Sequence, residues 1–161
     1  MKIMKSGVLG DVLESLLVSA ITLLKHCFIK RKQSATFQEK RKDTRETVGV
    51  LQIDFAENYT TAYQDEIQAA HWTSSQVTVF TAVGWSRGEV QSYAIVSDAL
   101  EHGKKAVATF LSNVVEDLMG KNPNMKDLHI FSDRAASQFK NRFIWSFMST
   151  TFRDMFPSLK V

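Results

Sequence analysis

Apolar positions in the middle of the chain are arranged as in the strands of a sheet. Residues 48–55 form a nearly continuous apolar run, which is typical of a central strand covered on both faces. Residues 76–85 alternate between apolar and polar positions, and residues 90–96 follow with the same character. Residues 86–89 have the composition of a hairpin turn. The pattern predicts three strands in an antiparallel meander.

Helical spacing of apolar residues follows the meander. Residues 102–119 carry an apolar stripe that ends near Gly120, and residues 135–155 carry a second, phenylalanine-rich stripe. The short apolar run 128–132 between them predicts a fourth strand, and residues 63–72 a short helix. The expected order is β-β-β-α-β-α in an α/β domain.

The first part of the chain has helical spacing throughout residues 11–45, with a change of character near 33–34 that could mark a bend or break. Its apolar segment 15–24 is shorter than the roughly 20 residues that a bilayer requires. We therefore expect no membrane partner and a helix packed on protein. The expected organisation is a helical, basic arm at 1–46 followed by a sheet domain at 47–161.

Composition supports one domain core, because 44% of the 161 residues are hydrophobic. The one cysteine, Cys27, excludes an intrachain disulfide and fits a reducing compartment. The whole chain carries a net charge of +3, but residues 25–45 hold eight basic and two acidic residues. This basic arm predicts a polyanion such as DNA as a partner, and a solvated helix face is the alternative. The arm residues expected to contact nucleic acid are Lys30, Arg31, Lys32, Lys40, Arg41 and Lys42.

Two aspartates stand at the ends of predicted strands. Asp54 lies at the end of the first strand and Asp133 directly follows the fourth. A crossover through a helix is nearly always right-handed and makes the joined strands parallel. If the fourth strand lies beside the first, both carboxylates emerge at one edge of the sheet, where a cation such as Mg²⁺ would relieve their repulsion. In the alternative, both are ordinary loop residues and Asp133 caps the following helix.

The residues around both aspartates resemble a known group of proteins. Gln52-Ile53-Asp54-Phe55 is similar to the first-strand motif of DDE-type transposases and retroviral integrases, and residues 132–141 resemble their second motif. The stretch from Asp54 through residue 72 also looks like one found in transposon-derived proteins of animal genomes. The resemblance implies an RNase H-like fold. It further implies that Asp54 and Asp133 bind Mg²⁺ or Mn²⁺ for phosphoryl transfer on DNA.

The resemblance is incomplete, because that group places its third acid on a later helix and has a fifth strand. The expected fold is thus an RNase H-like mixed sheet that is C-terminally incomplete, in a fragment or degenerate copy without full activity. Three acids are possible substitutes for the missing ligand: Glu57, Asp98 and Glu101. Acids at such positions are usually caps or solvated. The alternatives are a non-catalytic DNA-binding module and an interaction module that joins a partner chain or a second copy through its open sheet edge.

The start of the second predicted helix carries polar residues near the expected metal edge. Two interpretations apply to these residues, a contact with DNA and a solvated polar face. The residues are Gln138, Lys140, Asn141 and Arg142. The phenylalanines of that helix are expected in the hydrophobic core. The tryptophans, including Trp145, are expected to pack against other residues of the fold. A DNA partner predicts an intracellular protein, in the nucleus rather than the cytoplasm.

Overall fold

The protein consists of two compact units, the first ending at Glu39 and the second beginning at Lys40. The computed structural model describes residues 8–60, 75–133, 135 and 137–161. The short helix expected at 63–72 lies outside these residues. The two units are treated separately below.

Helix α1 (Leu9–Arg41) is continuous over 33 residues and buries none of them. The change of character near residues 33–34 does not break the helix, because that stretch contains neither proline nor glycine and α1 continues through it. By length and composition α1 could cross a membrane, since an 18-residue window has a mean hydropathy of 1.7 with none of it buried. The sequence analysis counted only the ten residues between Glu14 and Lys25 as apolar. The apolar part of the helix is longer, because it continues past these single charges.

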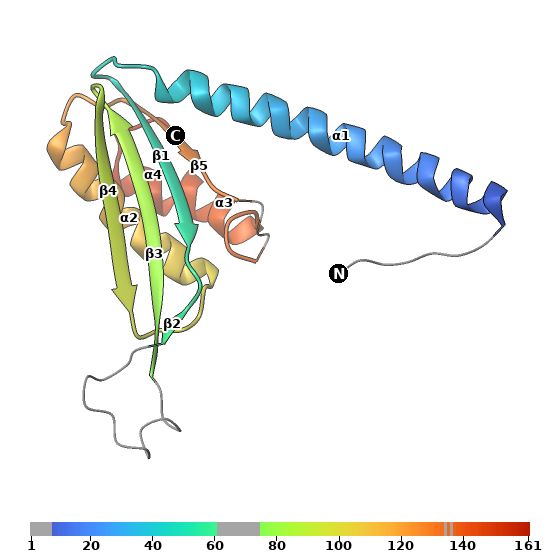
Figure 1. Ribbon diagram of the computed structural model, residues 1–161. Helices are drawn as coiled ribbons and strands as arrows, with labels where there is room; N and C mark the ends of the chain where they lie inside the picture. The colour runs from blue at the N-terminus through green and yellow to red at the C-terminus, as the bar shows by residue number, and fades with distance from the viewer. Residues whose placement is uncertain (1–7, 61–74, 134, 136) are drawn as a thin grey trace. The chain divides into compact units, whose positions relative to one another are not determined.

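The second unit is built on a mixed, open sheet (Figure 1). Strand β3 pairs antiparallel with β1 on one side and with β4 on the other, and β5 lies parallel to β1. A two-residue strand, β2, continues the line of β1 along β3. These pairings confirm the antiparallel meander and the position of the fourth predicted strand beside the first. The strands are β1 (Val48–Phe55), β2 (Tyr59–Thr60), β3 (Gln76–Ser86), β4 (Glu89–Ser97) and β5 (Asp127–Phe131).

The hairpin between β3 and β4 has a two-residue turn, Arg87-Gly88, flanked by the pair Ser86↔Glu89. Both turn residues have positive φ, 56° at Arg87 and 79° at Gly88. This backbone matches the right-handed twist of the strands, and it requires left-handed conformations that glycine adopts at low cost. The predicted hairpin is therefore confirmed at the expected residues.

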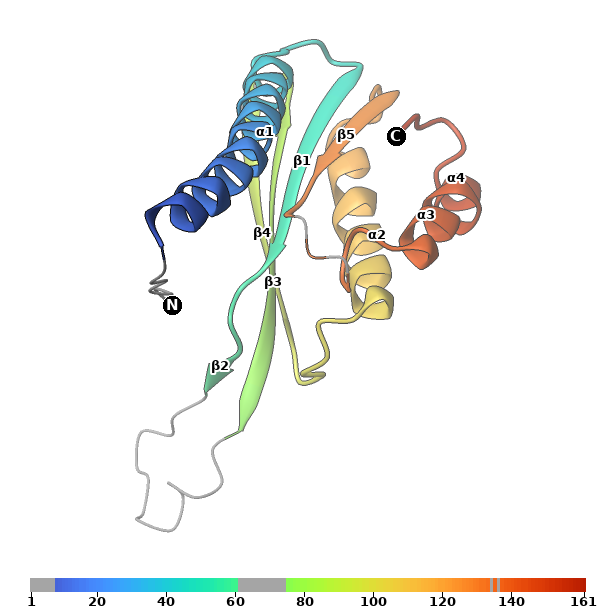
Figure 2. The same cartoon turned by 90° about the vertical axis from the view of Figure 1, so that its right-hand side faces the viewer.

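Three helices cover one face of this sheet (Figure 2): α2 (Lys104–Lys121), α3 (Arg142–Ser149) and α4 (Thr151–Met155). The apolar stripe of α2, including Leu111, Val115 and Leu118, packs against Leu51 and Phe80 of the sheet. Every second residue of β3 is buried, as expected for a strand with one face on a core. The core also includes Phe139 and Phe152, as the sequence predicted.

The single helix expected at residues 135–155 is wrong. It is replaced by α3, which begins after the cap Asn141, and by α4, which begins after Thr150. The Asn141 side chain accepts a hydrogen bond from the Ile144 N–H at 3.0 Å, so the helix starts there and not after Asp133. The backbone of Thr150 is not helical (φ −118°, ψ −90°), so α3 ends there and α4 begins at Thr151.

The outer edge of β5 is partly occupied by the last residues of the chain. Lys160 forms a parallel bridge with Asp127. Its carbonyl accepts from the Leu128 N–H at 2.7 Å, and its own N–H donates to the Lys126 carbonyl at 2.6 Å. The expectation that nothing extends the sheet beyond the fourth predicted strand is thus corrected at the start of β5.

Candidate functional site at the carboxyl edge of the sheet

The register of β1 and β5 brings Asp54 and Asp133 to the same edge. Their parallel pairing runs from Val48↔Asp127 to Gln52↔Phe131. Asp54 lies two residues beyond Gln52, and Asp133 lies two residues beyond Phe131, so both aspartates are equally far past the last pair. Both are exposed. The alternation of β1 places Asp54 on the face opposite Ile53, away from the core.

Backbone contacts hold the two aspartates in different ways. The Thr81 hydroxyl donates to the Asp54 carbonyl at 3.2 Å, and the structure gives the Asp54 carboxylate no partner among the residues that it describes. The Asp133 carboxylate accepts from the Ala135 N–H at 3.0 Å, in an Asx-type turn. Asp133 is therefore not the cap of α3, which corrects one alternative for this residue.

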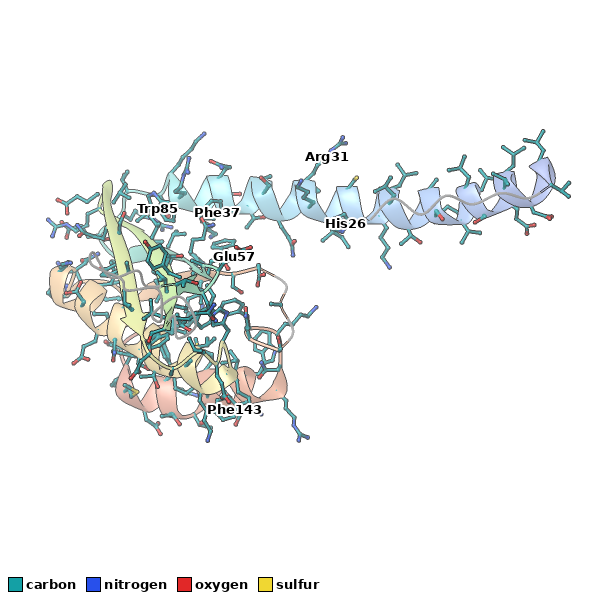
Figure 3. The ribbon with its side chains drawn as sticks, turned by 60° about the horizontal axis from the view of Figure 1, so that its bottom comes forward. His26, Arg31, Phe37, Glu57, Trp85 and Phe143 are labelled. Carbon is teal, nitrogen blue, oxygen red and sulfur yellow. The ribbon has the colours of Figure 1, made fainter. Side chains whose placement is uncertain are left out.

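The three possible substitute acids are all exposed on segments near this edge. Glu57 follows β1 (Figure 3), Asp98 follows β4, and Glu101 precedes α2, which begins at Lys104, two residues after the expected start at residue 102. Within the described part of the chain, no group of three or more His, Cys, Asp or Glu side chains is close enough to hold a metal ion. The register therefore brings Asp54 and Asp133 to one edge, and no cluster of three such side chains forms there among the described residues.

A β-bulge lies directly after Asp54. Phe55 pairs with Phe80 of β3. Tyr59 lies four residues after Phe55, but its partner Val77 lies only three residues before Phe80. The strand of β1 and β2 thus contains one extra residue between these pairs, which defines a bulge. Bulges of this kind change which face of the sheet the following side chains occupy.

The bulge directs Asn58 toward the helix side of the sheet. The Asn58 Oδ1 atom accepts from the hydroxyl of Thr78, which is 0% exposed, at 3.2 Å. The same oxygen lies 2.6 Å from Nε2 of His102. The His102 ring stacks on Phe55 with centroids 4.6 Å apart and an angle of 9°. Asn58, Thr78 and His102 were not identified from the sequence, because 44 positions separate Asn58 from His102 and no local pattern links them.

The polar residues before α3 divide into two groups. Lys140 and Arg142 are exposed, and Gln138 is half-buried. Asn141 instead caps α3 and donates from Nδ2 to the Gln138 carbonyl at 3.1 Å, so its side chain is occupied by the fold. Near this point the Lys104 ammonium of α2 lies 5.4 Å from the ring centroid of Phe143 (Figure 3). The exposed cations here are therefore Lys104 of α2, Lys140 before α3 and Arg142 at the start of α3.

Trp145 of α3 is 69% exposed. The expectation that this tryptophan serves packing is wrong, since helix α3 turns it away from the sheet that its neighbours Ile144 and Phe147 contact. The sequence did not indicate that Trp145 is exposed. The residue at which α3 begins determines which of its side chains face the core, and the spacing of the tryptophans does not reveal that residue.

The basic residues of the arm are mostly exposed. Lys30, Arg31 and Lys32 of the first unit are exposed on α1, with Arg31 projecting from it in Figure 3. In the second unit Arg41 and Lys42 are exposed and Lys40 is half-buried. The Arg41 guanidinium lies 5.7 Å from the ring centroid of Trp85. The charge of Arg41 is therefore partly engaged by an aromatic ring.

Fold and site define a mixed α/β domain, in which a helix precedes a mixed open sheet whose strands β1 and β5 bring Asp54 and Asp133 to one edge. The chain belongs to the family described as Domain of unknown function (DUF8701), whose model matches residues 33–156. No curated protein and no solved structure matches the chain.

Proposed function

We propose that this domain is an RNase H-like module of DDE-transposase and integrase descent, and that its carboxyl edge binds a divalent cation and nucleic acid. The observation that carries this proposal is the register of β1 and β5, which leaves Asp54 and Asp133 equally far past the pair Gln52↔Phe131. Two carboxylates at such a position repel each other unless a cation lies between them. Their oxygen atoms suit Mg²⁺ or Mn²⁺.

The strand arrangement supports the RNase H-like assignment. Three strands form an antiparallel meander, and α2 then connects β4 to β5, which lies parallel to β1. Because β4 and β1 are both antiparallel to β3, the strands β4, β1 and β5 all end at the same edge. Ligands of α/β sheets bind at this edge.

The chemistry of the edge sets a limit on activity. A metal held by two carboxylates keeps most of its water ligands and binds weakly. Two-metal phosphoryl transfer stabilises both the attacking and the leaving oxygen and needs more ligands than this pair supplies. We therefore infer binding of metal and DNA, with full strand cleavage or transfer belonging to the ancestor. A DNA partner also implies a nuclear protein.

Calorimetric titration with MnCl₂ tests the metal site. The wild-type protein should give a weak binding heat that Asp54→Asn and Asp133→Asn each remove. Asp11→Asn, an exposed aspartate of α1, is the matched control and should leave the heat unchanged. Equal heats in all four proteins would reject the metal site.

A second candidate function is non-catalytic DNA binding through the arm. The exposed Lys30, Arg31 and Lys32 of α1 favour it, because closely spaced cations bind phosphates with little sequence preference. This function predicts DNA affinity that depends steeply on salt and survives in Asp54→Asn. Association that is insensitive to salt would instead favour a module that joins a partner chain or a second copy.

A further inference from the structure

Helix α1 is apolar over about half of its circumference. Successive residues of an α-helix are rotated by about 100°, so residues three, four and seven apart lie on the same side. Six large side chains share one side of α1, the apolar side, and each is 60–69% exposed: Leu16, Leu17, Ile21, Leu23, Leu24 and Phe28. Large apolar side chains gathered in this way on an exposed surface mark a place of interaction.

The opposite side of the same segment is mostly polar. Its polar residues are Glu14, Ser15, Ser19, Thr22, Lys25 and His26, and the apolar exceptions are Val18 and Ile29. The Ser19 hydroxyl donates to the Ser15 carbonyl at 2.8 Å, and the Thr22 hydroxyl donates to the Val18 carbonyl at 3.4 Å. Both hydroxyl groups are therefore satisfied within the helix and need no protein partner.

Charges of opposite sign are separated along α1. Residues 9–24 contain two acids, Asp11 and Glu14, and no lysine or arginine. Residues 25–38 contain four cations and no acid, and all four cations are exposed: Lys25, Lys30, Arg31 and Lys32. The last three are consecutive, so they project in three directions about 100° apart. The apolar side is therefore followed directly by a segment that is positive on all sides.

The partner of α1 must match both features. An anionic lipid bilayer offers acyl chains for the apolar side and negative headgroups for the cations that follow it. Nucleic acid offers only the negative charge and would leave the apolar side in water. A second copy paired in parallel would bring Lys30, Arg31 and Lys32 of both chains together, which like-charge repulsion opposes. Charge and apolar surface together therefore favour lipid.

We propose that α1 lies in the plane of an anionic membrane surface, with its apolar side among the acyl chains and its cations on the headgroups. The length of α1 would also allow a span. A span, however, would carry Glu14, Lys25 and His26 toward the hydrocarbon, whereas a helix in the plane keeps this polar side at the water. The proposal replaces the expected packing of this helix on protein. It goes beyond the proposed function and is independent of Asp54 and Asp133.

The first test uses Cys27, the one cysteine of the chain, which falls on the apolar side. An environment-sensitive fluorophore on Cys27 of the full chain is mixed with phosphatidylcholine–phosphatidylserine vesicles that contain an acyl-chain quencher. The matched control carries the label on the polar side, in Cys27→Ser/Thr22→Cys. We expect quenching of the label at position 27 and little at position 22. Quenching at both positions would overturn the orientation in the plane, and quenching at neither would overturn membrane insertion.

The second test measures the apolar contribution by flotation with the same vesicles. Leu17→Gln/Leu24→Gln changes the apolar side, and Ser15→Gln/Ser19→Gln introduces the same residues on the polar side. The first variant should partition into vesicles at least about tenfold more weakly than the second. Equal partition of the two variants would contradict the proposal. Because α1 belongs largely to the first compact unit, thermal melts of the sheet domain should be the same in both variants.

The third test measures the role of the anionic headgroups. Lys30→Glu/Lys32→Glu should bind phosphatidylcholine–phosphatidylserine vesicles at least about tenfold more weakly than Lys105→Glu/Lys126→Glu, which makes the same charge change at exposed lysines of the second unit. Equal binding of the two variants, or equal binding of the wild type to vesicles of phosphatidylcholine alone, would reject the headgroup contact.

Sedimentation velocity without lipid separates the proposal from self-association. The wild-type chain should show no dimer that Leu17→Gln/Leu24→Gln dissociates. A dimer of this kind, in a protein that does not float with vesicles, would assign the apolar side to a second copy and reject the membrane.

Discussion

Gly49 of β1 lies directly against Met125. A Cβ atom on Gly49 would lie 2.6 Å from the Met125 sulfur and 3.2 Å from Cδ1 of Leu128. Both neighbours are only 1% exposed, so the methionine end must move within a packed core. We expect Gly49→Ala to lower the free energy of unfolding by about 1–2 kcal/mol, measured by urea denaturation.

Gly120 provides the matched control for this prediction. It lies in α2, and a Cβ there would meet nothing within 4 Å. Gly120→Ala should therefore raise the free energy of unfolding by about 0.5–1 kcal/mol, because alanine loses less backbone entropy in a helix. If both variants were destabilised equally, contact with Met125 would not be the cause.

The turn Arg87-Gly88 allows a stabilising change. Arg87 has a φ of 56°, a conformation that asparagine adopts more readily than arginine. We expect Arg87→Asn to raise the free energy of unfolding by about 0.5–1 kcal/mol. The ion pair that it removes, Arg87 to Glu46 at 3.7 Å, is exposed and contributes little. Glu46→Gln, which removes only the ion pair, should leave stability nearly unchanged.

Stability should decrease in mild acid because of His129. Burial lowers the pKa of His129 below its ordinary 6.5, and the nearby Lys40 lowers it further. The unfolded chain then binds a proton more readily than the folded protein, so the free energy of unfolding falls as the pH drops below about 6.5. Thermal melts of His129→Gln should show a smaller decrease between pH 7 and pH 5. His26→Gln, at an exposed histidine of α1, should keep the wild-type slope.

Reversing the charge of Arg31, Lys32, Arg41 and Lys42 should weaken binding to a DNA duplex by at least about tenfold. The slope of affinity against salt should also decrease, by up to about 4 on a log–log plot, as four phosphate contacts are lost. Flotation with anionic vesicles serves as the control for this experiment, because α1 is long and apolar enough to span a bilayer. If the variant loses vesicle binding but retains DNA affinity at low salt, the arm is not the DNA contact.

The sheet could be predicted from sequence because its signals are local. The apolar run of β1 and the alternation of β3 each reflect the faces that the strand buries. The parallel direction of β5 followed from the rule for crossovers through a helix, whereas its position beside β1 was a condition of the argument that the structure meets. The same reasoning brought Asp54 and Asp133 to one edge.

Other features could not be predicted, for identifiable physical reasons. Phenylalanine spacing predicted one long helix, but the side-chain cap at Asn141 and the non-helical backbone of Thr150 decide where α3 and α4 begin. The bulge after Phe55 depends on one extra residue opposite β3, and only the register of both strands reveals it. The contact of Asn58 with His102 depends on this bulge, so it was equally invisible in the sequence.

The pairing of β1 with β5 has a consequence for how the chain folds. Val48 pairs with Asp127, 79 positions later (127 minus 48), whereas Gly49 pairs with Ser86 only 37 positions later (86 minus 49). Closing the longer loop costs more chain entropy, and topologies rich in distant pairings fold slowly. The meander can therefore form on the ribosome before β5 has been synthesised. The edge with both aspartates is then assembled after the meander, and it does not exist in any nascent chain shorter than 133 residues.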